Sequence, residues 1–176
     1  MPGAFLTGDL VTLRTIEEED LPFVRDGVNH PAVRRPIGQK LPTNLAQETR
    51  EFEARNADGE GLRLLITHQD VRVGIIQLAP IDTENGTARV TYWIDPSHRR
   101  QGYARDALDA IAGYAFDELR VHKLTARVFA FNEASIELLR GAGFTEEGVH
   151  REESFVDGRY VDAHWLGLLE REWREE

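Results

Sequence analysis

Cysteine is absent from this sequence of 176 residues, which excludes disulfide bonds, thiolate metal ligands and a cysteine nucleophile. Long apolar runs are also missing, so no segment is expected to cross a bilayer. The first residues lack the basic stretch and the apolar stretch of a signal peptide. We therefore expect a cytoplasmic protein without a membrane partner.

Basic residues are outnumbered, because 21 Lys and Arg stand against 31 Asp and Glu, for a net charge of −10. Non-specific binding to nucleic acid depends on neutralising phosphates with cations, so no nucleic-acid partner is expected. An acidic surface favours the approach of a cationic substrate such as an amine, although it serves solubility equally well. The six histidines show no paired spacing with carboxylates, so no metal site is predicted.

The remaining composition is that of an ordinary globular protein, with 41% hydrophobic and 30% charged residues. The length suits a single domain over residues 1–176. Hydrophobic periodicity and turn signals predict the order of the elements. The expected strands are 10–14, 62–67, 71–81, 88–94, 124–131, 149–156 and 159–169. The expected helices are 20–29, 45–54, 103–119 and a short one after Asn132. A loop is expected at 33–36, and the tail from Glu170 is expected to be a solvated end.

Two pairs of turn residues predict hairpins. Asn85-Gly86 tolerates positive φ at both positions and should join its flanking strands antiparallel, and Asp157-Gly158 should join the last two strands. Strands 88–94 and 124–131 are separated by a helix, so they are predicted to be parallel neighbours joined by a crossover. Such a parallel pair binds ligands at the carboxyl ends of its strands.

The junction between strand 88–94 and the long helix carries the most chemical information. Arg99, Arg100, Gln101 and Arg105 gather around the helix start, and Gly102 permits close approach of the backbone. Free N–H groups give a helix start a partial positive charge, so cations there repel one another unless an anion lies between them. A diphosphate would satisfy this arrangement. A solvated, arginine-rich turn is the alternative.

Two motifs in this order resemble the GNAT N-acetyltransferase superfamily. The Arg-x-x-Gly-x-Ala motif over residues 99–104 follows a Trp-Ile-Asp-Pro strand end and is similar to the acyl-CoA loop of that family. The stretch 132–144 is similar to the second half of the family signature. Residues 13–21 resemble the RimJ/RimL branch, which acetylates protein N-termini. The resemblance covers nearly the whole chain.

The resemblance implies a mixed α/β (α+β) fold, with a mostly antiparallel sheet of about seven strands flanked by helices and one splayed parallel pair. It also implies that acetyl passes directly from acetyl-CoA to an amine, with the pantetheine arm in the splayed gap. Many members use a tyrosine as the acid. In this sequence Leu139 stands one turn after Ser135 and no tyrosine is nearby, so the Ser135 hydroxyl is the predicted acid, with a water molecule as the alternative. The residues predicted to bind acetyl-CoA are Trp93, Ile94, Arg99, Arg100, Gln101, Gly102, Tyr103, Ala104, Asn132, Ser135 and Leu139.

The general base is expected on strands that face the gap. Asp162 and His164 should point to the same side of the last strand, and a histidine can accept a proton near neutral pH. Asp82 and Glu84 beside the first hairpin are further candidates, either for the base or for contacts with the substrate. The alternatives are a structural histidine and solvated acids.

The residues alone leave the acceptor open. In the family, the region between the first two helices covers the acceptor site, so Arg34 and Arg35 are predicted to bind a substrate carboxylate or backbone. Exposed arginines on a turn are the alternative. The pKa of an α-amine is about 7.7–8.0 and that of a lysine is about 10.4, so much of an α-amine is already neutral at cellular pH, whereas a lysine needs a base to remove its proton. The lack of an obvious base therefore favours a protein or peptide N-terminus as the acceptor.

A small amine, such as a polyamine, an amino sugar or an antibiotic, is the rival acceptor. A non-catalytic acyl-CoA-binding module and a purely structural interaction domain are alternatives from other classes. A homodimer is also expected, because dimers are common in the family.

Overall fold

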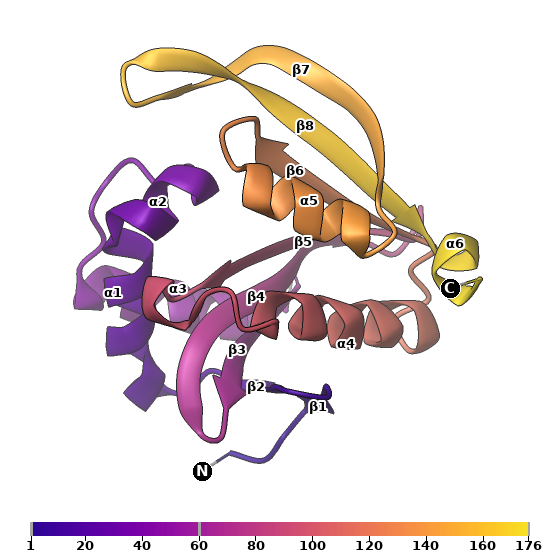
Figure 1. Cartoon of the computed structure of the whole chain (residues 1–176). Helices are drawn as coiled ribbons and strands as arrows, with labels where there is room; N and C mark the ends of the chain where they lie inside the picture. Colours follow the sequence, from indigo (N-terminus) through magenta and orange to yellow (C-terminus); the bar gives the residue numbers. More distant parts are fainter. Residues whose placement is uncertain (1, 60, 176) are drawn as a thin grey trace.

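The fold is built on one eight-stranded mixed sheet (Figure 1). The computed structural model describes residues 2–59 and 61–175. The strand order is β1-β2-β3-β4-β5-β6-β8-β7, and every neighbouring pair is antiparallel except β5 and β6. The strands are β1 Leu6–Thr7, β2 Thr12–Thr15, β3 Leu62–His68, β4 Val71–Asp82, β5 Thr87–Ile94, β6 Lys123–Phe129, β7 Thr145–Val156 and β8 Arg159–Leu169.

This architecture confirms the predicted mixed sheet with a single parallel pair, and it adds one strand to the expected number. The added strand is β1, which pairs with β2 over two residues. The strand expected from residue 10 begins only at Thr12, because the N–H groups of residues 9–11 donate to the carboxylate of Asp106 instead of to a neighbouring strand. The short β1 carried too little periodicity to be predicted.

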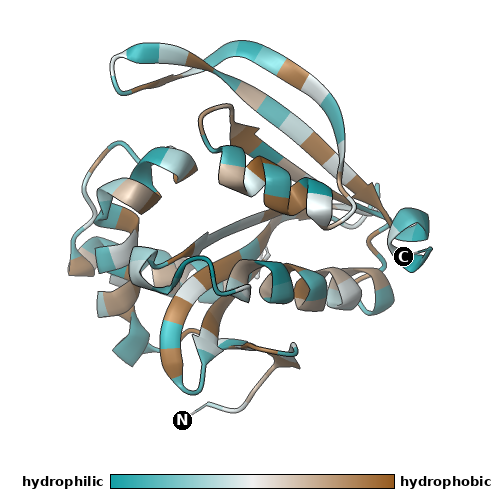
Figure 2. Ribbon diagram, viewed as in Figure 1, coloured by the Kyte–Doolittle hydropathy of each residue, from teal (hydrophilic) through white to brown (hydrophobic). Residues whose placement is uncertain are grey.

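Six α-helices and two 3-10 turns surround the sheet in the described part of the chain. Along β3, β4 and β5, alternate side chains enter two different cores, as period-two alternation requires. One core contains side chains of α4 and α5, and the other contains side chains of α1, α2 and α3. Hydrophobic residues recur along α4, as Figure 2 shows. The helices are α1 Leu21–Asn29, α2 Pro31–Ile37, α3 Leu45–Asp58, α4 Tyr103–Asp117, α5 Glu133–Gly141 and α6 Glu170–Arg174, and the 3-10 turns are η1 Glu18–Asp20 and η2 Pro96–His98.

Two segments that were expected to be irregular are helical. The predicted loop 33–36 lies inside α2, because Pro31 occupies the first helical position and the His30 ring accepts the N–H of Ala32. Proline stops a preceding helix and is equally suited to starting the next one. The predicted solvated tail forms α6, because the Trp173 ring packs 5.5 Å from the Phe116 ring of α4.

The parallel strands β5 and β6 separate after three paired positions. Their last pair is Arg89 with Thr125, after which β5 follows β4 and β6 follows β8. We call the gap between the diverging strands the fork. Backbone groups that would pair in a continuous sheet face this gap, so an extended ligand can bind along it.

The hairpin β7–β8 arches over the sheet toward α2 (Figure 1). At its tip, Asp157 forms an ion pair with Arg35 of α2, with 3.2 Å between the charged atoms. The hairpin and α2 therefore meet across the open side of the fork.

Candidate active site

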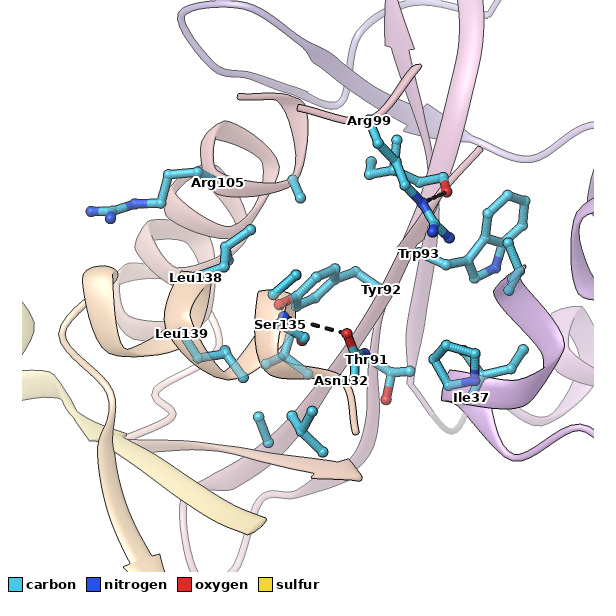
Figure 3. Close-up of a pocket in the computed structure, with 18 of the residues that line it drawn as sticks. Ile37, Thr91, Tyr92, Trp93, Arg99, Arg105, Asn132, Ser135, Leu138 and Leu139 are labelled. Atoms are coloured by element: carbon cyan, nitrogen blue, oxygen red, sulfur yellow. Dashed lines mark hydrogen bonds between the residues drawn. The ribbon is translucent and has the colours of Figure 1, made fainter. Parts of the chain in front are cut away.

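A cavity of about 550 Å³ occupies the fork. Its walls come from α2, β5, the loop after β5, the first turn of α4, β6 and α5 (Figure 3). The sequence-predicted residues that line it are Trp93, Ile94, Arg99, Arg100, Gly102, Tyr103, Ala104, Asn132, Ser135 and Leu139. The structure therefore gathers residues from two motifs that are about thirty positions apart in the chain around one hollow.

The start of α4 opens onto this cavity without a capping side chain. Gly102 takes the N-cap position at φ 83, in the left-handed region, where its missing side chain avoids strain. The first N–H bonded inside the helix belongs to Asp106, which donates to the Gly102 carbonyl. The N–H groups of residues 103–105 thus point out of the helix start, an arrangement that binds an anion.

The arginines around this helix start have different neighbours. Arg100 is exposed, adopts φ 60 and forms no ion pair within the described residues. Arg105 bonds Asp109 and the Gly141 carbonyl, and in Figure 3 it extends away from the side chains around Tyr92. Arg100 is consequently the arginine that is most available to an anion at the helix start.

Arg99 connects the loop to the opposite wall of the cavity. Its Nε donates to the Ile94 carbonyl at 3.2 Å and its Nη2 donates to the Ala32 carbonyl of α2 at 2.8 Å. Burial lowers the pKa of Arg99, and the charge of Asp95 opposes that shift. Gln101, also predicted to bind acetyl-CoA, does not line the cavity, because its side chain accepts the Tyr103 hydroxyl.

Ser135 meets a tyrosine that was not predicted for the site. The Tyr92 hydroxyl and the Ser135 hydroxyl lie 2.8 Å apart, although the residues are 43 positions apart in the chain. Asn132 caps α5 by accepting the Ser135 N–H at 3.4 Å (Figure 3). The alternation of β5 puts Tyr92 on the α4 side of the sheet, which was the available signal, but the contact itself needs the packed fold.

Burial raises the pKa of Tyr92 to about 12, and the hydrogen bond with Ser135 opposes the shift. Tyr92 therefore stays protonated at neutral pH, and its hydroxyl can share a hydrogen bond with the Ser135 hydroxyl in either direction. Because the folded protein holds the Tyr92 proton to higher pH than the unfolded chain does, stability falls as pH rises from 10 toward 12.

Tyr92→Phe should remove this loss of folding stability at alkaline pH. Tyr92 has a pKa of about 10 in the unfolded chain and about 12 in the folded protein. Between these values, ionisation of Tyr92 is expected to lower the free energy of unfolding of the wild type by roughly 1 kcal/mol per pH unit. Denaturant unfolding at pH 9 and pH 11 measures the difference. Tyr160→Phe is the matched control, because Tyr160 is exposed. Equal pH dependence of the two variants would contradict the assignment.

The four acid–base candidates predicted from the sequence lie outside the cavity. Asp162 accepts the N–H of Glu152 at 2.8 Å, and His164 lies 2.9 Å from the carboxylate of Glu146. Both residues are on β8, and β6 separates β8 from the fork. The expectation that they face the gap is wrong for this reason.

Asp82 and Glu84 serve the turn that begins after β4. The Asp82 carboxylate accepts the N–H groups of Glu84 and Asn85 and the side-chain amide of Asn85. These bonds lower the pKa of Asp82. Glu84 is exposed in the same turn, outside the cavity.

Arg34 and Arg35 also lie outside the cavity, although their helix borders it. The α2 side chains that line it are apolar, from Ala32, Val33, Pro36 and Ile37. Arg35 is held by Asp157 at the hairpin tip. The α2 wall of the cavity is therefore an apolar surface with cations at its margin.

The charge inside the cavity has one sign. Among the described residues that line it, none is Asp or Glu, whereas five are arginines: Arg89, Arg99, Arg100, Arg105 and Arg127. His98 is the imidazole of the lining, and its Nδ1 lies 3.0 Å from the Ser97 hydroxyl. In the described part of the chain there is no cluster of three or more potential metal ligands, and no helix is long and apolar enough to span a bilayer.

Comparison with known proteins places this geometry in a family. Residues 11–145 match the family described as acetyltransferase (GNAT) domain. Spermidine N(1)-acetyltransferase of Vibrio cholerae is 27% identical over 165 residues, which cover 93% of this chain and 95% of that protein. YdaF of Bacillus subtilis, whose name assigns it provisionally to the ribosomal N-acetyltransferases, is 29% identical over 126 residues, covering 72% of this chain and 69% of YdaF.

The likeness extends to the three-dimensional structure. A crystal structure of the Vibrio cholerae spermidine N-acetyltransferase in complex with CoA and spermine superposes with a TM-score of 0.90 at 25% identity. The superposition covers 94% of this chain and 98% of that one.

Proposed function

Since this chain belongs to the GNAT acetyltransferase family and is an acetyl-CoA-dependent N-acetyltransferase, we propose that its acceptor is the α-amine of a protein or peptide. The observation that carries the proposal is the absence of carboxylates among the described residues of the cavity wall. An α-amine has a pKa of about 7.7–8.0, so about half or more of it is neutral near pH 8 and it reacts without a strong base, whereas a side-chain or polyamine nitrogen does not. The resemblance of residues 13–21 to the RimJ/RimL branch supports the same acceptor.

We assign the donor to the α4 and α5 side of the fork. The N–H groups of residues 103–105, together with Arg100, are suited to a diphosphate, and the diverging backbones of β5 and β6 are suited to an extended pantetheine arm. Acetyl-CoA supplies an activated acetyl thioester. Ser135 would donate a proton to the departing sulfur, and Tyr92 would hold the Ser135 hydroxyl in place.

A polyamine is the second candidate acceptor, favoured by the likeness to spermidine N-acetyltransferases. The cavity opposes it, because Arg89 and Arg127 would repel a polycation that enters from the α2 side. The predicted homodimer and cytoplasmic location remain predictions.

The test has two measurements on the same protein. Calorimetry should show acetyl-CoA binding, and Arg100→Glu should weaken that binding about 10- to 100-fold through the loss of a charged contact. Arg159→Glu is the control, because it reverses an exposed charge far from α4. Unchanged affinity in Arg100→Glu would contradict the diphosphate assignment.

The second measurement follows release of free CoA thiol with peptides and with spermidine as acceptors. We expect thiol release with peptides that have a free amino terminus and none with the same peptides after N-terminal blocking. Faster turnover of spermidine than of every peptide would overturn the proposed acceptor.

A further inference from the structure

We propose that Arg89 and Arg127 form an anion-recognition site at the inner end of the fork, which selects acceptors carrying a carboxylate near the reacting amine. This inference rests on the proposed α-amine acceptor and specifies its chemistry. The carboxylate can belong to an acidic N-terminal side chain or to a free amino acid, and the experiment below separates these two sources.

The two arginines lie on the acceptor side of the sheet. In β5, Val90 and Ile94 belong to the core that contains α4, whereas Trp93 packs in the core that contains α1 and α2. Alternation puts Arg89 on the same face as Trp93. Arg89 is also the last β5 residue paired with β6, so it marks the closed end of the fork. An acceptor that enters beside α2 would reach it.

Arg89 is held in place but lacks a counter-charge. Its guanidinium lies over the Trp165 ring, 4.8 Å from the ring centroid. Its Nε is buried and has no hydrogen-bond partner, and it forms no ion pair within the described residues. Stacking on a ring face leaves the in-plane N–H groups free to bind a planar carboxylate. A buried donor without a partner costs free energy, so its retention calls for an explanation, and a binding role for this arginine supplies one.

Arg127 supports this site from β6. Its Nε donates to Glu153 at 2.7 Å and its Nη2 donates to the Ser154 hydroxyl at 2.8 Å, which fix the side chain. Arg127 lines the cavity, and Glu153 does not. The acceptor side of the cavity wall therefore presents two guanidinium groups. That of Arg127 is paired with Glu153, which does not line the cavity, whereas that of Arg89 has no counter-charge among the described residues.

The segment around α2 adds charge of the same sign. Residues 27–47 contain Arg34, Arg35 and Lys40 but no Asp or Glu, and of these cations Arg35 is paired with Asp157 of the hairpin tip. The whole protein has a net charge of −10, so this stretch contrasts with the average surface. A local positive field raises the encounter rate of anionic ligands and repels polycations.

The experiment compares matched acceptors. Peptides that begin with Asp or Glu are set against the same peptides that begin with Asn or Gln. Free amino acids are set against their amides, with rates compared per neutral amine, because the carboxylate raises the pKa of the α-amine. Wild-type enzyme should prefer the acid over the amide by about 10- to 100-fold in kcat/KM, the range of a charge-assisted contact. The peptide arm reports a side-chain carboxylate, and the amino-acid arm reports an α-carboxylate.

Arg89→Gln should reduce this ratio to near one while acetyl-CoA binding persists, and Arg89→Lys should keep part of it. Arg50→Gln removes an exposed charge from α3 and should leave the ratio unchanged. If Arg89→Gln fails to fold, Arg127→Gln and Arg89→Lys provide the same ratio measurement. A purely structural Arg89 would lower activity toward both acceptors equally.

The failures are distinguishable. Equal turnover of acidic and amide acceptors by the wild type, or a ratio that survives Arg89→Gln, overturns this inference and leaves the α-amine acceptor standing. Absence of turnover with every peptide and amino acid, despite acetyl-CoA binding, overturns the proposed function itself.

Discussion

Ser135→Ala should lower kcat about 100- to 1,000-fold, within the range that general acid catalysis contributes. The Ser135 hydroxyl lies in the cavity at hydrogen-bond distance from Tyr92. Under the proposed mechanism, its removal leaves the departing thiolate without a proton donor. The affinity for acetyl-CoA should change by no more than about two-fold, because the proposed diphosphate contacts are at the uncapped start of α4. Steady-state turnover and calorimetry on the same sample measure both quantities.

Ser135→Thr is the matched control for this prediction, since it retains a hydroxyl on the same Cβ. Most of the turnover should return in this variant, and the melting temperature of both variants should stay close to that of the wild type. A kcat for Ser135→Ala that equals the wild-type kcat would show that Ser135 does not protonate the thiolate.

Asp20→Asn should lower the free energy of unfolding by about 3–5 kcal/mol, the cost of breaking a buried ion pair from one side. The Asp20 side chain is fully buried and accepts hydrogen bonds from Arg14 at 2.7 and 3.0 Å and from Arg72 at 2.6 Å. Arg14 is itself only 5% exposed. The variant leaves that guanidinium in the interior with a neutral partner.

The pH dependence of stability tests the same network. Burial raises the pKa of Asp20, but the hydrogen bonds from Arg14, the Glu17 N–H and Arg72 outweigh it and lower the pKa to about 2. A lowered folded-state pKa means that this stability is present above about pH 4 and is lost as pH falls toward 2. Asp20→Asn should lack this acid-dependent component.

Denaturant unfolding at pH 7, and between pH 4 and pH 2, measures both effects. Asp26→Asn is the control, because the Asp26 side chain is 68% exposed and its pair with Arg25 is a surface pair. Such pairs contribute about 0–1 kcal/mol. A comparable cost in the two variants would contradict the importance assigned to the buried network.

Much of the fold could be predicted because its signals act over short distances. Asn85-Gly86 turns between β4 and β5 as expected, and Asn44 caps α3 by accepting the Gln47 N–H. The long helix starts at Tyr103, directly after the glycine, and the crossover makes β5 and β6 parallel neighbours. In each case, the decisive residues are close in the chain or belong to one periodic pattern.

The wrong predictions share a different cause. Pro31 was interpreted only as a helix stop, although it also starts α2. The charged residues of the tail showed no apolar pattern that would have predicted the packing of Trp173 on α4. Asp162 and His164 do point to one side of their strand, but the strand order puts β6 between them and the fork. Periodicity gives the side of a strand and does not give its neighbours.

The sequence by itself determined where the chain turns, which stripes enter the core and where a helix start is left uncapped, because each depends on contacts within a few positions. Only the tertiary structure decided which side chains share the cavity. Tyr92 reaches Ser135 from 43 positions away, and Arg89 ends at the closed end of the fork because β5 and β6 diverge directly after it. Such long-range contacts arise from how the strands are ordered and paired, which no local pattern encodes.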